Sequence, residues 1–159
     1  AIGISTMTIS LLEQREIEAR MAAALVDRLA DSLGRDQALV IAGQAVRDLA
    51  RQAGRDLRRQ TGVGTLEVLA QAAQDIWARD GALTIDFLEI SSTVLRFNVT
   101  RCRYAERYAE MDVGELGYFL SCGRDAAFAR GFNPDIRLTR THTIMQGAAF
   151  CDFHFELAP

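Results

Sequence analysis

Lysine is missing from this sequence of 159 residues, and all 18 of its basic residues are arginine. A chain without lysine has no side-chain amine for a Schiff base, so that form of covalent catalysis is excluded. The 21 acidic residues outnumber the basic ones, which gives a formal net charge of -3 and a pI of about 5.4. A general nucleic-acid binder needs a basic face to neutralise phosphates, so we do not expect this function.

Long apolar runs are also absent from the sequence. No segment approaches the roughly 20 apolar residues that cross a bilayer, and no basic stretch followed by an apolar one indicates a signal peptide. Cysteine is scarce, with three scattered residues, and an odd number argues against a disulfide framework. We therefore expect no membrane partner and a cytoplasmic location.

The first half of the chain has helical periodicity. Apolar residues recur every three or four positions in three stretches, which predicts three amphipathic helices. Thr8 or Ser10 can cap the first helix, and Gly34 can end it. Thr65 can cap the third. We therefore expect a helical part over about residues 8–80.

The second half changes to the alternation of strands. Apolar and polar side chains alternate over residues 83–87 and 95–99, which predicts a hairpin with its turn near Ser91. A mostly helical segment follows. Alternation then returns over residues 136–157, which predicts two more strands joined by a turn at 145–148.

This order of elements predicts an α+β fold, with N-terminal helices followed by an antiparallel sheet of about four strands with interposed helices. The length suits a single domain with one core, so we expect one domain over residues 1–159. Its sheet-containing part is expected at residues 82–157.

The alternation along the C-terminal strands assigns a face to each side chain. Arg140 and His142 fall on the face of the apolar residues, where a solvated charge is not expected. A charge on a buried face must be paired or must meet a ligand, so an inward Arg140 implies an anion. Cys151 also falls on the inward face, whereas His154 falls on the polar face.

The three cysteines allow three interpretations. A free cysteine is commonly a small buried apolar residue. The thiols and His142 could instead form a zinc site of the Cys₃His type, although no CxxC motif supports it: Cys102, Cys122 and Cys151. Finally, Cys122 could be a nucleophile with a lowered pKa if it begins a helical segment, with Asp125 close enough to move a proton.

A series of motifs in the second half resembles a known family. In order, they are Cys102-x-Tyr104-x-Glu106, Glu115-Leu116-Gly117, Cys122-x-x-Asp125, Gly131-Phe132-Asn133-Pro134, Arg140-Thr141-x-Thr143 and Gly147-x-x-x-Cys151-Asp152-Phe153-x-Phe155. From about Leu83 to Leu157 this pattern resembles the L-2-amino-thiazoline-4-carboxylic acid hydrolase family. The last motif is also similar to the end of 4-vinyl reductase type small-molecule-binding domains, in which clustered cysteines can hold zinc.

The resemblance to the hydrolases implies an enzyme that opens a small cyclic amidine acid, such as L-2-amino-thiazoline-4-carboxylate, to a carbamoyl-cysteine by hydrolysis at a carbon–nitrogen bond. The substrate carboxylate would be the anion that Arg140 requires. The catalytic candidates are a nucleophile, Cys122 or Cys151, and two proton-transfer groups, Asp125 and His142. The candidates for substrate binding are Arg140, Thr141, Tyr104, Tyr118 and Gly147. No cofactor is expected, apart from zinc if the cysteines bind it.

Other functions remain open from the sequence. The chain could be an enzyme of the same family that acts on another small heterocyclic or unsaturated acid. It could also be a small-molecule-binding or zinc-containing module of the 4-vinyl reductase type. The amphipathic pattern of the first two helices further predicts a homo-oligomer.

Overall fold

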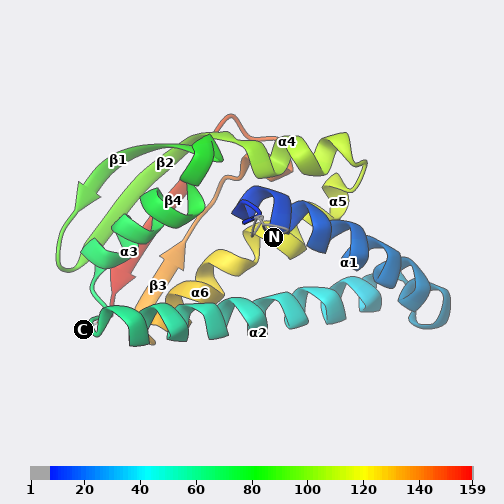
Figure 1. The fold of residues 1–159 in the computed structure, drawn as a ribbon, viewed down its shortest axis with the longest axis horizontal. Coiled ribbons are helices and arrows are strands. Elements are labelled where there is room, and N and C mark those ends of the chain that lie inside the picture. Colours follow the sequence, from blue (N-terminus) through cyan, green and yellow to red (C-terminus); the bar gives the residue numbers. More distant parts are fainter. Residues whose placement is uncertain (1–7, 159) are drawn as a thin grey trace, which may run out of the picture.

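The computed structural model describes residues 8–158 and arranges helices and strands in the expected order (Figure 1). Two long helices come first, α1 (Leu11–Leu33) and α2 (Arg35–Thr61). Ser10 caps α1, because its hydroxyl accepts a hydrogen bond from the backbone N–H of Glu13 at 3.1 Å. Gly34 separates the two helices with a φ of 82°, a positive value that glycine adopts without steric cost.

A short helical segment connects the long helices to the sheet. Helix α3 (Leu66–Ala72) is capped by the side chain of Thr65, as the sequence predicts. It continues into a π-helical turn, η1 (Ala73–Trp77), and a 3₁₀ turn, η2 (Arg79–Gly81).

The sheet has four antiparallel strands in the order β1-β2-β4-β3. Its first hairpin consists of β1 (Leu83–Ile90) and β2 (Val94–Cys102), and its C-terminal pair consists of β3 (Ile136–Thr139) and β4 (Cys151–Leu157). The prediction of an α+β fold with four antiparallel strands and interposed helices is therefore confirmed.

Four helical segments lie between the two strand pairs. They are α4 (Arg103–Glu110), α5 (Gly114–Gly117), a π-helical turn η3 (Tyr118–Cys122) and α6 (Arg124–Phe132). The helical phase changes at η3, so Tyr118 does not stay in line with Asp125 as it would on one continuous α-helix.

The predicted C-terminal hairpin is only partly right. The first strand was expected to run to Ile144, but β3 ends at Thr139. Residues 140–150 connect β3 to β4 through a 3₁₀ turn, η4 (Ile144–Gln146), instead of a tight hairpin turn. Strand alternation is therefore no guide to side-chain direction in the coil beyond Arg140.

The main core lies on one face of the sheet. Phe97 and Phe155 on the strands are fully buried against Leu66 and Leu69 of α3 and Phe132 of α6. The opposite face carries polar side chains such as the exposed Arg96 and Glu156. A second core joins α1 and α2 to α4 and α5, so the helical and sheet-containing parts share buried contacts.

Helix α6 lies against α2 at a very short distance (Figure 1). Two glycines make this approach possible, because a Cβ on Gly54 would lie 2.1 Å from the Phe128 carbonyl oxygen. A Cβ on Gly131 would lie 2.0 Å from the Arg51 carbonyl oxygen. The glycine contact thus fixes the helix whose first turn carries Asp125.

Candidate active site

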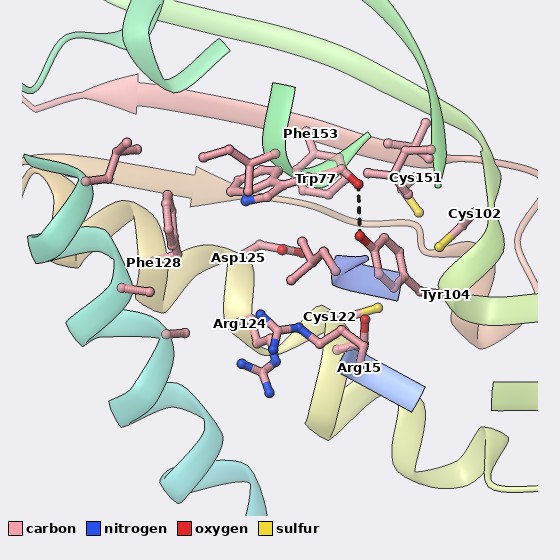
Figure 2. Close-up of a pocket in the computed structure, with 18 of the residues that line it drawn as sticks. Arg15, Trp77, Cys102, Tyr104, Cys122, Arg124, Asp125, Phe128, Cys151 and Phe153 are labelled. Carbon is pink, nitrogen blue, oxygen red and sulfur yellow. Dashed lines mark hydrogen bonds between the residues drawn. The ribbon is translucent and has the colours of Figure 1, made fainter. Parts of the chain in front are cut away.

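A cavity of about 350 Å³ lies between α1, α2, α6 and the inner face of the sheet (Figure 2). This volume is in the range of sites for small organic molecules. Much of the wall is apolar: Trp77 and Phe128, which both line the cavity, pack edge to face with their ring centroids 5.4 Å apart. Polar groups enter it from the segment that joins η3 to α6, namely Cys122, Arg124 and Asp125.

The cavity brings together six of the residues that the sequence singles out. They share no element, and strands, helices and a loop each contribute: Cys102, Tyr104, Cys122, Asp125, Arg140 and Cys151. Four other predicted residues do not line this cavity: Tyr118, Thr141, His142 and Gly147. The motif residues therefore divide into a group within the site and a group on the loop beside it.

Arg140 points inward, and the anion that it meets belongs to the same chain. Its Nη1 donates to Oδ2 of Asp125 at 2.5 Å, and its Nη2 donates to the carbonyl oxygen of Cys122 at 2.9 Å. The guanidinium also lies over the ring of Phe153, 4.8 Å from the centroid. The inward charge is thus paired by the protein itself before any substrate binds.

Asp125 has the properties of a proton-transfer group. Burial raises the pKa of its carboxyl above the ordinary value, although the charge and hydrogen bond of Arg140 oppose the shift. Hydrogen bonds among the described residues use Oδ2 and leave Oδ1 without a protein donor. A carboxylate with a raised pKa and a free oxygen beside a cavity is suited to act as a general base.

His142 does not belong to the cavity, and the prediction that it points inward is wrong. Its side chain is 56% exposed. The ring stacks on Phe150, with centroids 5.6 Å apart, and Nδ1 lies 2.7 Å from Oγ1 of Thr141. The error arises because β3 ends at Thr139, and the coil that follows turns the imidazole away. His154 on β4 is half-buried on the polar face, as expected.

Thr141 and Gly147 shape the loop beside the cavity. Asp152 accepts hydrogen bonds from the backbone N–H and the hydroxyl of Thr141 and from the backbone N–H of His142. Desolvation would raise the pKa of Asp152, but these hydrogen bonds outweigh it and lower the pKa to about 2. Gly147 has a φ of 94° and ends η4. The two residues therefore have structural roles in this loop.

The thiols are held in their protonated form. Burial raises the pKa of Cys102 to about 11 and raises the pKa of Cys122 further, with the charge of Asp125 adding to the shift. Burial also raises the pKa of Cys151. Cys122 ends η3 two residues before α6, and burial outweighs any effect of that helix terminus on its thiol.

The described residues contain no group of three or more His, Cys, Asp or Glu side chains arranged to hold a metal ion. Two of the thiols accept backbone hydrogen bonds instead: Cys102 from Ala105 at 3.4 Å and Cys151 from Ile144 at 3.2 Å. The cysteine set proposed as a zinc alternative therefore lines one cavity without the spacing of a metal site.

Tyr104 closes one side of the cavity with a fixed hydroxyl (Figure 2). Its O–H donates to the carbonyl oxygen of Trp77 at 2.9 Å, and burial raises its pKa to about 12. The phenol is thus neutral at physiological pH, and its oxygen can still accept a hydrogen bond.

Two arginines in the cavity wall were not among the predicted site residues. Arg15 of α1 and Arg124 of α6 lie close together in Figure 2, and both line the cavity. The sequence holds a weak signal for each. Arg15 follows Leu11 and Leu12 by one helical turn, on the inward side of an amphipathic helix, and Arg124 precedes Asp125 directly.

Comparison with known proteins assigns the chain to a family. The sequence profile described as L-2-amino-thiazoline-4-carboxylic acid hydrolase matches residues 14–155. The chain belongs to this family. The match covers the helical half as well as the motif-bearing half, and so extends the resemblance beyond residues 83–157. No curated protein sequence matches the chain.

Two solved structures share the fold of this hydrolase-family chain. One is a trafficking protein particle complex subunit 3 from Naegleria fowleri covalently bound to palmitic acid, with a TM-score of 0.55, 8% identity, and coverage of 92% of this chain and 96% of that one. The other is the phenol-responsive sensory domain of the transcription activator PoxR with phenol, with a TM-score of 0.55, 13% identity, and coverage of 87% and 73%. At such low identities the likeness concerns the fold alone.

No helix in the described part of this family member has both the length and the apolar character that a transmembrane segment requires.

Proposed function

We propose that this chain hydrolyses a small cyclic amidine acid, such as L-2-amino-thiazoline-4-carboxylate, inside the cavity that Asp125 and Arg140 line. The family supports the reaction class. The observation that carries the proposal is the buried carboxyl of Asp125, which has a raised pKa, a fixed orientation on Arg140 and one oxygen without a protein donor. These are the properties that a general base requires near neutral pH.

In the proposed reaction, water is the nucleophile. Asp125 takes a proton from it as the oxygen bonds to the amidine carbon, and the C=N electron pair moves to the ring nitrogen. The tetrahedral carbon then forms its carbonyl as its bond to the ring nitrogen breaks, and this nitrogen leaves as an amine. Both protons of the water end on that nitrogen, one of them returned by Asp125, so the product is a carbamoyl-cysteine with the mass of substrate plus water.

Arg140 is proposed to position Asp125 in this reaction, because its two terminal nitrogens already contact Asp125 and the Cys122 carbonyl. Cys122 is the alternative nucleophile. Its raised pKa means that Asp125 would first have to remove the thiol proton. The burial of this thiol removes the usual advantage of a thiolate over water, and a thiol route would add a covalent intermediate that water must then hydrolyse. The route with direct attack by water has fewer steps and is therefore favoured.

A second candidate function is a small-molecule-binding module without catalysis. The apolar wall formed by Trp77, Phe128 and their neighbours favours it, because a small polar acid does not need such a surface. Structures of similar fold with palmitic acid or phenol are compatible with an apolar ligand. Zinc bound by the cysteines would belong with this second candidate, and metal analysis of the purified protein would detect it.

The test is turnover of L-2-amino-thiazoline-4-carboxylate, followed by mass spectrometry of the carbamoyl-cysteine. Asp125→Asn should reduce kcat by about 100-fold or more, as expected for loss of a general base. Asp135→Asn, at an exposed position, is the matched control. Cys122→Ser should keep most of the activity. Activity that survives in Asp125→Asn but disappears in Cys122→Ser would replace the water route by a thiol route, and binding without turnover would favour the module.

The wild-type protein is also proposed to act in the cytoplasm and as a homo-oligomer. The oligomer is suggested by exposed apolar residues on α1, namely Ile17, Met21 and Leu25, which are 59%, 64% and 56% exposed. They recur at four-residue intervals and so form one stripe on the helix. Light scattering would give the mass.

A further inference from the structure

One wall of the cavity holds two arginines that share a single carboxylate. Arg15 reaches it from α1 and Arg124 from the first turn of α6, and both contact Oε2 of Glu18. Arg15 Nη1 donates at 2.7 Å, and Arg124 Nη2 donates at 2.8 Å. The two side chains are 19% and 14% exposed, so water compensates little of their charge.

The charges at this wall do not balance. Glu18 offsets one of the two arginines. Asp125 does not offset the other, because it pairs with Arg140. Asp56, which also lines the cavity from α2, pairs with Arg59. One positive charge therefore remains without a partner among the described residues.

The same wall retains hydrogen-bond donors. Arg124 uses Nε on the Leu120 carbonyl oxygen and Nη2 on Glu18, which leaves Nη1 without an acceptor in the described chain. Within the described chain, Arg15 donates hydrogen bonds only through Nη1, so its other nitrogens are also available. Burial lowers the pKa of Arg124 and the neighbouring charge of Arg15 lowers it further, whereas the charges of Glu18 and Asp125 oppose the shift. An anion placed here would gain a net charge interaction and at least two charge-assisted hydrogen bonds.

We propose that Arg15 and Arg124 form the subsite that binds the carboxylate of an organic acid in this cavity. As the carboxylate site of the hydrolysed substrate it rests on the proposed function, but as an anion subsite it stands on the charges alone. It separates two roles that an inward arginine can have: Arg140 holds Asp125, and Arg15 and Arg124 hold the ligand. Because Arg124 directly precedes Asp125 in the sequence, the acid group would then lie near the proposed base.

Binding of matched probes by calorimetry tests the subsite without any turnover. The first pair is L-2-amino-thiazoline-4-carboxylate and 2-amino-thiazoline, which lacks the carboxylate. The second pair is benzoate and benzamide, which do not depend on the hydrolase assignment. In the wild-type protein we expect the acid of at least one pair to bind about 10-fold more tightly than its neutral partner.

Three variants should change the preference for the acid over its neutral partner in predictable directions. Arg15→Gln and Arg124→Gln should each reduce the preference for the acid by about 10-fold. Glu18→Gln should increase it, because it removes the carboxylate that competes for the same donors. Arg20→Gln is the control, since this arginine lies on α1, is 67% exposed and pairs with Glu16. The opposite response to Glu18→Gln cannot result from a variant that merely folds poorly.

The outcomes for the subsite and for the hydrolase are separable. Preference for the acid that responds to the three variants, in a protein without turnover, would establish the subsite and overturn the proposed reaction. The subsite would be overturned if the protein shows turnover but its preference for the acid is unchanged in Arg15→Gln and Arg124→Gln. Equal affinity for acid and neutral partner in both probe pairs would overturn it as well.

Discussion

Arg140 and Asp125 form a buried ion pair that joins the loop after β3 to the first turn of α6, with 2.5 Å between Nη1 and Oδ2. The two side chains are 9% and 21% exposed. Each charge depends on the other, because neither has enough water around it to be stable alone. The pair therefore links the stability of the fold to the protonation of the proposed base.

Replacement of Arg140 should destabilise the protein strongly. Arg140→Met would leave the carboxylate of Asp125 without its partner, and we expect the free energy of unfolding to fall by about 3 kcal/mol. Chemical denaturation measures this loss. Arg137→Met on the exposed side of β3 is the control and should change stability by about 0.5 kcal/mol or less. Equal effects at the two positions would show that the pair contributes nothing specific.

The contribution of Asp125 to stability should decrease as the pH rises, as expected for a buried acid. Its pKa is raised in the folded protein from the ordinary 3.8, so its protonated form favours folding. That contribution is complete below 3.8 and is lost as the pH rises through the folded pKa. Relative to Asp125→Asn, the wild-type protein should therefore lose stability as the pH increases from 3.8 towards neutrality, as denaturation at several pH values would show.

The same titration should govern activity, because a general base works only after it has lost its proton. We expect kcat/KM for the thiazoline acid to rise with pH through the raised pKa of Asp125. A rising limb that stays near pH 3.8 would contradict the raised pKa. A limb that shifts in Cys122→Ser would identify the thiol as the titrating group.

The sequence predicts side-chain direction correctly only as far as the strand extends. Alternation places Arg140 inward, and the structure agrees, because this residue follows Thr139 at the end of β3 directly. Two residues later the backbone is coil, and His142 lies outside the cavity. The end of β3 depends on where pairing with β4 stops, and pairing is a tertiary property that alternation does not contain.

The cavity itself depends on contacts that are distant in sequence. Arg15 and Arg124 are 109 positions apart, and they share Glu18 only because the fold brings α1 next to the start of α6. The thiols show the same limit in another way. A lowered pKa was expected for Cys122 if it began a helical segment, but this residue ends η3, and burial raises the pKa of its thiol.

The position of His142 outside the cavity predicts that its loss affects activity far less than loss of the proposed base, Asp125. The side chain is 56% exposed, and its polar and ring interactions within the described residues are with Thr141, Phe150 and Asp152. His142→Ala should therefore change kcat by less than about twofold. His154→Ala is the control on the polar face of β4. Turnover assays of both variants test this. A loss of about 100-fold in His142→Ala alone would mean that the loop closes over the cavity during the reaction.

The contact between α2 and α6 should be intolerant of a single methyl group. In Gly54→Ala the new Cβ would lie 2.1 Å from the Phe128 carbonyl oxygen, and the backbone atom cannot move without shifting α6. We expect a loss of about 1–3 kcal/mol in the free energy of unfolding, together with lower activity, because α6 carries Asp125. Gly114→Ala is the matched control, since its Cβ would meet nothing within 4 Å. Calorimetric melting and turnover of both variants give the comparison, and an unchanged melting temperature in Gly54→Ala would contradict the close helix contact on which the position of the proposed base depends.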